Sequence, residues 1–533
     1  MNNRLFTSTE RNYYMNSDLY CITMRGKEKW ILIVILFIAF IFRFQHIQSI
    51  PSGLYPDEAM NGNNALEALE TGDFKIFYPE NNGREGLFIN IQALSLKVFG
   101  AEPWALRIVS AIFGFLTVLG LYFLARILFN WQIASLASFY LAISFWHVNF
   151  SRIGFRAIMI PFLMVWGFYF LWHGLKDFRF GDFALSGVFF GLGLHTYIAF
   201  RFVPFIVMLL LLAYWLSIKR DYNHEKYLHL RNEFIRRFAL FFLAAFLVAL
   251  PLLFYFWQNP TDFLGRGGQV SIFETEEPIK NFLKSLGLTL ASFNFTGDFN
   301  WRHNFSGEPL LFWPVGVFFV IGLLKSISKM FKKIRKHGHP ATSHILLLSW
   351  FFIMLAPSFL TWEGIPHALR SIGVLPVVMI FAAEGTWWFF ETLIHWYREK
   401  DIHPLESPYQ KEHEARFIVG VALIILMLAI GIAEYDKYFN KWAKRPEVQG
   451  AFTADFVELG RQINQLPKEL PKYVLVNASE TLVNGIPMPA QTVMFITETY
   501  TEKKQKEKNL FYILPDEKRF ITEKNAIILP MMK

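Results

Sequence analysis

Long apolar runs separated by short polar segments recur along the chain from residue 30 to residue 433. Each run has roughly 18 to 22 residues, which is enough for a helix to cross a lipid bilayer. The pattern predicts an all-α polytopic membrane domain over residues 30–433 with about eleven transmembrane helices. The predicted spans are 30–50, 104–128, 132–149, 157–176, 182–198, 202–218, 237–257, 309–328, 343–360, 371–397 and 416–433.

The pattern changes after residue 433. Residues 451–466 carry apolar side chains at helical spacing, and four short apolar runs divided by polar residues follow them. These runs are predicted to be buried strands, at residues 473–476, 493–496, 511–514 and 526–529. We therefore expect residues 434–533 to form a small α/β domain that packs on the membrane domain or shapes an acceptor site.

Lys and Arg gather in four connecting segments, namely residues 25–29, 219–237, 325–336 and 398–416. With eleven spans, all four fall on one side, and the positive-inside rule assigns that side to the cytoplasm. This predicts a plasma (inner) membrane protein with residues 1–29 in the cytoplasm. Loops 51–103 and 258–308 and the C-terminal domain are then extracytoplasmic.

Composition supports the membrane assignment. The chain is 53% hydrophobic and only 18% charged, whereas soluble domains have about 25% charged residues. The net charge of +9 would suggest a nucleic-acid partner in a soluble protein, but the basic loops explain it here, so we expect a lipid bilayer and no nucleic acid. The single cysteine, Cys21, excludes an internal disulfide framework.

Two adjacent carboxylates, Asp57 and Glu58, follow the first apolar run directly. Charged groups are costly at a membrane, so they are candidates for chemistry at its surface. The structural alternative is that they begin an interfacial helix, where acidic side chains complement the helix dipole.

Arginines occur in short outer connections that the positive-inside rule expects to be poor in them. They are Arg107, Arg152, Arg156, Arg201 and Arg370. Each of them alone could extend to the lipid headgroups as an anchor. Together, on the side that carries Asp57, they predict a cationic cavity suited to a phosphate, which guanidinium groups bind bidentately.

The second outer loop carries Asp298, Arg302 and His303 among aromatic residues, a mixture typical of a sugar- or headgroup-binding loop. His195, Tyr197 and His367 lie near predicted span ends and are further candidates for substrate binding, although such histidines more often make interfacial hydrogen bonds. Asp298 and His303 lack helical metal-ligand spacing and no cysteine accompanies them, so we expect no metal site.

One carboxylate beside several arginines favours a particular reaction. A glycosidase needs two carboxylates because its leaving group must be protonated. A lipid phosphate leaves as an anion and needs only cations, while the incoming hydroxyl needs a base. The residues therefore predict glycosyl transfer from a polyprenyl-phosphate sugar to a hydroxyl acceptor, with Asp57 as the base.

Three motifs give the chain a family resemblance. Tyr-Pro-Asp-Glu-Ala at 55–59, Gly-Arg-Glu-Gly-Leu at 83–87 and Gly-Ala-Glu-Pro-Trp-Ala-Leu-Arg at 100–107 resemble the membrane-embedded C-type glycosyltransferases. Within that superfamily the chain is similar to the branch of protein O-mannosyltransferases and the lipid A aminoarabinose transferase. The likeness covers roughly residues 30–130, and the segments around Arg152 and 366–370 resemble bacterial members more loosely.

The resemblance implies a C-type glycosyltransferase fold and an inverting reaction with a lipid-linked sugar-phosphate donor, without an obligatory cofactor or metal. It makes Asp57 the general base and Glu58 its support or a sugar ligand. It places Glu85 at the donor or acceptor and Arg107 at the lipid phosphate. Where the aminoarabinose branch has Glu-Lys, this chain has Arg84 before Glu85, so Arg84 is expected to replace that lysine.

Two other functions are compatible with a polytopic chain. One is a transporter or flippase of a polyprenyl-linked glycan, which is expected to place its charges near the bilayer midplane within repeated halves. Here the charges lie at span ends and no repeat is evident. The other is a catalytically silent scaffold whose soluble tail is the working part. The sugar and the class of acceptor are not determined by the sequence.

Overall fold

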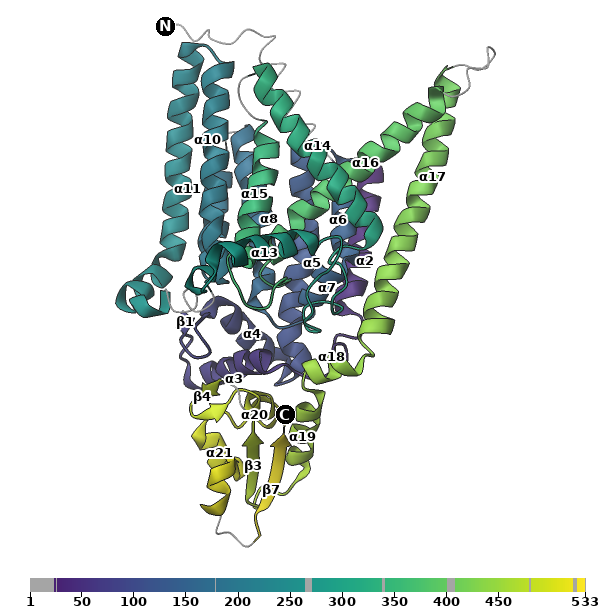
Figure 1. The fold of residues 1–533 in the computed structure, drawn as a ribbon. Coiled ribbons are helices and arrows are strands. Elements are labelled where there is room, and N and C mark those ends of the chain that lie inside the picture. The colour runs from purple at the N-terminus through teal and green to yellow at the C-terminus, as the bar shows by residue number, and fades with distance from the viewer. Residues whose placement is uncertain are drawn as a thin grey trace.

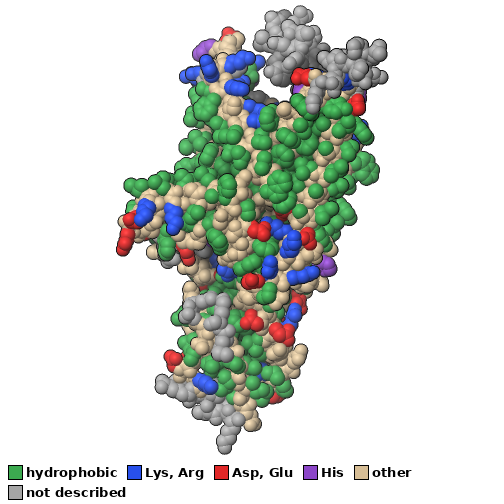
Figure 2. Space-filling view, turned by 45° about the vertical axis from the view of Figure 1, so that its right-hand side comes forward, with side chains coloured by type: hydrophobic (Ala, Val, Ile, Leu, Met, Phe, Trp, Pro, Cys, Tyr) green, Lys and Arg blue, Asp and Glu red, His purple; other side chains and the backbone are tan. Residues whose placement is uncertain are grey.

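The computed structural model describes residue 24 and residues 26–177, 179–263, 271–337, 341–399, 408–478, 481–520 and 525–532. Most of the chain forms an elongated bundle of helices, and the last part forms a small lobe at one end of it (Figure 1). On the face seen in Figure 2, hydrophobic side chains cover most of the bundle. Charged side chains gather at the end of the bundle away from the lobe and in the region next to the lobe.

Every predicted span overlaps a helix of the bundle. These helices are α2 (Gly26–Phe44), α5 (Pro103–Leu128), α6 (Trp131–Ile143), α8 (Met159–Asp177), α9 (Phe180–Leu194), α10 (Val203–Asp221), α11 (His224–Gln258), α14 (Trp313–His337), α15 (Thr342–Phe359), α16 (Leu375–Glu399) and α17 (Pro408–Tyr435). Within the described residues, eight are long and apolar enough to cross a membrane, whereas α6 and α9 are shorter and α2 carries charges near both ends. Of the eight, α16 is the most buried, and α17 and α11 are the least buried.

The predicted span 132–149 is divided. Helix α6 ends at Ile143, and a short helix α7 (Phe145–Phe150) follows after Ser144. The buried carboxylate of Glu434 on α17 accepts a hydrogen bond from the backbone N of Phe145 at 2.6 Å. The interruption leaves this backbone N–H without a partner inside the helix, and a side chain distant in the sequence accepts its hydrogen bond instead. The apolar pattern of the sequence does not indicate such a break.

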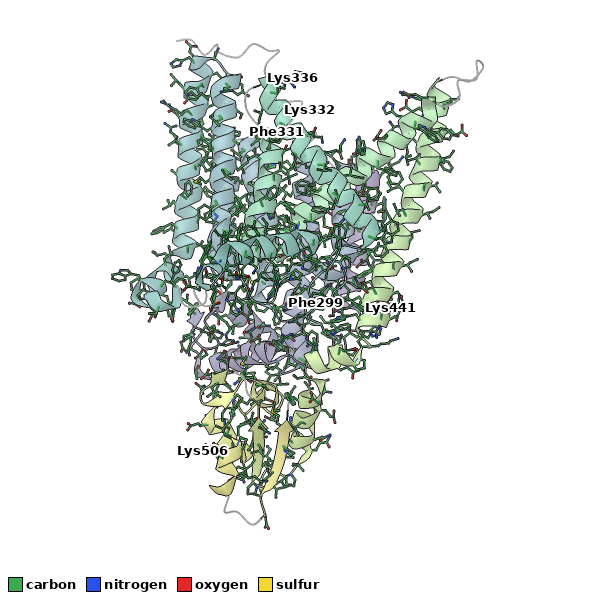
Figure 3. All side chains as sticks on the ribbon, viewed as in Figure 1. Phe299, Phe331, Lys332, Lys336, Lys441 and Lys506 are labelled. Carbon is green, nitrogen blue, oxygen red and sulfur yellow. The ribbon has the colours of Figure 1, made fainter. Side chains whose placement is uncertain are left out.

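The basic segments lie together at the end of the bundle away from the lobe. The connection between α10 and α11 and the far ends of α16 and α17 share this end (Figure 1). Lys332 and Lys336 of α14 lie there too (Figure 3). The relative placement agrees with the predicted topology, and the compartment that each end faces remains a prediction.

The segment 51–103, which was predicted to be an outer loop, is largely folded into structure that the apolar pattern did not predict. It contains α3 (Pro56–Thr71), a two-stranded hairpin of β1 (Phe77–Tyr78) and β2 (Arg84–Glu85), and α4 (Gly86–Phe99). Together with α13 (Pro278–Ala291), these helices lie across the end of the bundle (Figure 1). Helix α3 starts at Pro56, which suits a first helical position, and the Glu58 carboxylate accepts from the backbone N of Tyr55 at 3.3 Å.

The C-terminal lobe is the predicted α/β domain. A three-stranded parallel sheet, in the order β6 (Leu510–Ile513), β3 (Lys472–Asn477), β7 (Ile527–Met532), forms its centre. The remaining elements are α18 (Pro446–Ala451), α19 (Ala454–Gln465), α20 (Ala490–Thr497), α21 (Glu502–Lys508) and the hairpin of β4 (Leu482–Val483) and β5 (Ile486–Pro487). A π-helical segment, Asp436–Trp442, continues α17 toward the lobe.

The predicted strand at 493–496 is wrong, because these residues belong to helix α20. Phe495 of α20 packs against α3 of the membrane domain, while Val493 and Met494 join the core of the lobe. Since α20 is buried on nearly all sides, its apolar run has no helical period and is indistinguishable from a buried strand.

Candidate active site

Asp57 lies in the first turn of α3 and is half-buried. Asn81, from the loop between β1 and β2, donates its Nδ2–H to Asp57 Oδ1 at 2.5 Å. The carboxylate lines a cavity of about 100 Å³. The other lining residues are Asn61, Asn81, Arg84, Phe155, Arg156, Ala157, Tyr197 and Leu369.

Arg84 brings one positive charge to this cavity. It is buried and donates to Asn61 Oδ1 at 2.8 Å and to Asn64 Oδ1 at 2.6 Å. Burial, with a smaller contribution from Arg156, lowers the pKa of Arg84 to about 10, so the side chain stays protonated at neutral pH. Two neutral amides of α3 therefore hold the guanidinium at the cavity, and the Glu80 carboxylate lies 3.9 Å from Arg84 Nη2.

Arg156 brings the second charge. Its Nε lies 3.0 Å from Glu85 Oε2, and its guanidinium stacks over the Tyr197 ring at 5.3 Å from the centroid. Glu85 is buried and does not line the cavity in which Arg156 and Tyr197 meet. Glu85 therefore orients the Arg156 guanidinium from outside the cavity.

Glu58 and Arg107 form a buried pair away from the cavity. Arg107 Nε and Nη2 lie 3.0 and 3.1 Å from the two carboxylate oxygens of Glu58. Arg107 also donates to the carbonyls of Pro51 at 2.6 Å and Gly53 at 2.8 Å, and Glu58 accepts from the backbone N of Gly154 at 2.7 Å. This arrangement argues against phosphate binding by Arg107 and indicates that the pair fixes the start of α3.

Arg152 is also buried away from the cavity. It donates to the carbonyls of Phe42, Arg43 and Ile50 at or beyond the C-terminal end of α2. Arg43, which the sequence analysis did not select, makes the same kind of contact with the carbonyls of Leu141 and Ala142 at the end of α6. These cations complement the negative ends of helix dipoles. The only indication of this role in the sequence was that Arg43 is a charged residue at the end of an apolar run.

A second cluster lies beside the cavity. Asp298, in the loop before α14, lies near His303 of the same loop and near His367 from the loop before α16. Phe299, the neighbour of Asp298, is at the end of the bundle that faces the lobe (Figure 3). The ring of His303 lies 6.4 Å from that of Phe155, which lines the Asp57 cavity.

Arg302, from the same loop as Asp298, stacks over the ring of Tyr55 at 3.8 Å from the centroid. Tyr55 directly precedes α3, and its ring contacts that of Phe155 at 6.1 Å. Arg302 thus joins this loop to the segment that carries Asp57 and does not itself line the cavity.

The remaining candidates, His195, Arg201 and Arg370, do not line the Asp57 cavity. His195 Nε2 lies 2.9 Å from the carbonyl of Val248 on α11, and Arg201 donates to the carbonyl of Phe263 at 2.7 Å. Arg370 donates to Thr361 Oγ1 at 2.7 Å and lines a second, mainly apolar cavity of about 230 Å³. Tyr197 lines both cavities, so they adjoin.

The site also contains amides that the sequence analysis missed. Asn61 and Asn64 hold Arg84, and Asn81 holds Asp57. The polar stretch 61–64, which lies within the buried part of α3, was the available indication.

The comparisons with known proteins agree with this architecture. The profile of the family described as dolichyl-phosphate-mannose-protein mannosyltransferase matches residues 87–235. No curated protein sequence matches the chain. Solved structures match it over nearly its whole length, at low sequence identity.

ArnT from Cupriavidus metallidurans, solved bound to undecaprenyl phosphate, is 13% identical with a TM-score of 0.54, and the match covers 95% of this chain and 93% of ArnT. The apo oligosaccharyltransferase of Archaeoglobus fulgidus is also 13% identical with a TM-score of 0.54, over 92% of this chain and 65% of that protein. The chain thus spans about two thirds of the archaeal enzyme. AglB from the same organism, in complex with an inhibitory peptide and a dolichol-phosphate, is 14% identical with a TM-score of 0.52, over 93% of this chain and 70% of AglB.

The chain has the fold of the membrane-embedded C-type glycosyltransferases, as its motifs predicted. The chain therefore shares its fold with these membrane glycosyltransferases, and residues 87–235 match the mannosyltransferase profile. Neither likeness supports the transporter or the scaffold alternative.

Proposed function

We propose that the protein transfers a sugar from a polyprenyl-phosphate donor to a hydroxyl acceptor, with inversion at the anomeric carbon, at the outer face of the plasma membrane. One observation carries the proposal: the Asp57 carboxylate lines a single cavity with the guanidinium groups of Arg84 and Arg156. A base and two cations in one hollow match a reaction in which a hydroxyl attacks and a phosphate leaves.

In the proposed step, Asp57 accepts the proton of the acceptor hydroxyl. The acceptor oxygen forms a bond to the anomeric carbon as the bond from that carbon to the phosphate oxygen breaks. The lipid phosphate leaves with the electron pair, and Arg84 and Arg156 stabilise its charge without a general acid. A single displacement of this kind inverts the anomeric configuration. Glu85, Glu58 and Arg107 are positioning residues in this scheme, and the step requires neither a nucleotide nor a metal.

The adjoining cavity is our proposed entry for the donor lipid. It is lined mainly by apolar side chains, with Arg370 among them, and it meets the Asp57 cavity at Tyr197. An isoprenoid chain fits the apolar walls of this cavity. The phosphate at its end requires cationic side chains, which lie where the two cavities meet. Two similar structures, one bound to undecaprenyl phosphate and one in complex with a dolichol-phosphate, support a donor of this class.

Replacing Arg156 by glutamine is expected to raise the KM for the donor about 10-fold or more, because a hydrogen bond to a charged group contributes about 1.5–3 kcal/mol. Arg156→Lys is expected to recover part of this loss, since it keeps the charge but not the planar fork. Steady-state kinetics with a fixed acceptor measure both variants. Arg179→Gln, at an exposed arginine outside the site, is the matched control. An unchanged donor KM in Arg156→Gln would place the phosphate elsewhere.

The function itself is tested by incubating the detergent-purified full chain with a panel of polyprenyl-phosphate sugars and with hydroxyl acceptors of lipid, glycan and peptide type. We expect consumption of one donor, release of the polyprenyl phosphate and an inverted linkage in the product. Transfer directly from a nucleotide sugar, or a product that retains the configuration of the donor, would overturn the proposal. The panel also identifies the acceptor class.

A further inference from the structure

The cluster of Asp298, His303 and His367 is a compact set of metal-ligand side chains that the proposed reaction does not use. One ligand atom from each lies within 4.8 Å of the others. His303 Nδ1 is 3.0 Å and His367 Nδ1 is 3.9 Å from the same oxygen, Asp298 Oδ2. The two imidazole rings lie side by side, with centroids 4.9 Å apart. Two nitrogens and one oxygen thus converge on one point.

These separations are close to those of a metal centre. Zn²⁺ binds histidine nitrogen and carboxylate oxygen at about 2.0–2.2 Å, and tetrahedral ligand atoms are then about 3.3 Å apart. The two distances to Asp298 Oδ2 fall on either side of that value. Three protein ligands leave a fourth position for water, and His367 is only partly buried, which gives an ion a path from solvent.

The surrounding backbone holds the carboxylate in place, as outer-shell hydrogen bonds do for metal ligands. The backbone N of Asn300 donates to Asp298 Oδ1, and that of Ala368 donates to Asp298 Oδ2, each at 2.8 Å. The loop is closed behind Asp298, because the backbone N of Gly307 donates to the Asp298 carbonyl at 3.0 Å. Asp298 is therefore fixed before any ion arrives.

We propose that Asp298, His303 and His367 bind one divalent first-row metal ion, with Zn²⁺ as the best match to two imidazoles and one carboxylate. The ion would connect the outer loop that precedes α14 to the loop that precedes α16. Its neighbours place it beside the Asp57 cavity: His303 contacts Phe155, and Leu369 lies two residues after His367, and both Phe155 and Leu369 line that cavity. The ion fixes one wall of the site and takes no part in the sugar-transfer step.

The sequence alone predicted no metal here because the third ligand is remote. Asp298 and His303 belong to one loop, but His367 follows helices α14 and α15. No motif spacing connects ligands that only the fold brings together. The site does not depend on the proposed function, since it could hold an ion whatever reaction the neighbouring cavity performs.

The test uses the full chain purified through a tag without histidine, treated with a chelator and then equilibrated with Zn²⁺ or Co²⁺. Metal analysis after removal of excess ion is expected to find about one equivalent per chain, and Co²⁺ to give visible absorption bands of nitrogen and oxygen coordination. His367→Gln and Asp298→Asn are each expected to weaken metal binding at least about 10-fold. His195→Gln, which removes a histidine outside the cluster, is expected to bind as the wild type does.

Thermal unfolding separates loss of the site from loss of the fold. Zn²⁺ is expected to raise the unfolding temperature of the wild type and of His195→Gln, because an ion that binds only the folded state stabilises it. It should leave that of His367→Gln unchanged, even though this variant folds. Equal metal content in His367→Gln and wild type, or no bound ion in either, would show that Asp298 and the histidines form a hydrogen-bonded network only. No readout involves sugar transfer, so the result is independent of the enzymatic proposal.

Discussion

Replacing Asp57 by asparagine is expected to lower the turnover number for sugar transfer by about 10²- to 10⁴-fold, the usual contribution of a general base. An asparagine has nearly the same shape and can still accept the hydrogen bond that Asn81 now donates to Asp57 Oδ1. The cavity therefore keeps its form while losing the group that takes the proton of the acceptor. Because Arg84 and Arg156 are untouched, the donor should still bind.

Two measurements are needed for this variant. Single-turnover transfer reports the chemical step, and binding of the polyprenyl phosphate reports the cationic part of the site. The matched control is Asp73→Asn, which makes the same replacement at an exposed carboxylate just beyond α3. Transfer at the wild-type rate by Asp57→Asn would rule out Asp57 as the base. Loss of both transfer and donor binding would instead indicate that Asp57 organises the cavity.

The sequence predicted which residues gather at one cavity better than it predicted their contacts. Asp57, Arg84, Arg156 and Tyr197 were candidates on sequence grounds, and they line one cavity. The same reasoning selected Arg107, which the structure buries against Glu58. Charge and position along a span predict which end of the bundle an arginine occupies. They do not predict the direction in which its side chain points, which the partner packed against it decides.

The fold was predicted correctly where the length of an apolar run is enough to indicate a membrane-spanning helix. Apolar runs of membrane-spanning length became helices throughout the bundle, since a helix satisfies its own backbone in lipid. The apolar pattern did not predict helix α3, because several of its buried positions, among them Asn63 and Asn64, are polar and break the apolar period. Only the acidic pair indicated a helix start there, as the structural alternative to a catalytic role. Asn63 donates to the backbone carbonyl and the side chain of Gln491 in α20. The C-terminal domain thus buries polar residues that local sequence assigns to the surface.

Breaking the pair of Glu58 and Arg107 is expected to destabilise the protein by about 3–5 kcal/mol, because removing one partner leaves the other charge buried and uncompensated. The Arg107 side chain is 1% exposed and that of Glu58 is fully buried, so water cannot replace the lost partner. Either Glu58→Gln or Arg107→Met should lower the thermal unfolding temperature in detergent. The double variant should be less destabilised than the sum of the two single variants, since it leaves no lone charge.

The exposed pair of Lys280 and Glu277 provides the matched control, because both side chains are mostly in solvent and such pairs contribute at most about 1 kcal/mol. Glu277→Gln should therefore leave the unfolding temperature nearly unchanged. The decisive comparison is made with Arg107→Met at a temperature where it remains folded. An unchanged donor KM there supports a positioning role, since the fold holds Arg107 against Glu58 and two backbone carbonyls, away from the cavity. A raised donor KM without loss of stability would instead indicate that Arg107 binds the donor phosphate. In that case the Asp57 cavity would have to open toward α5 when the donor binds.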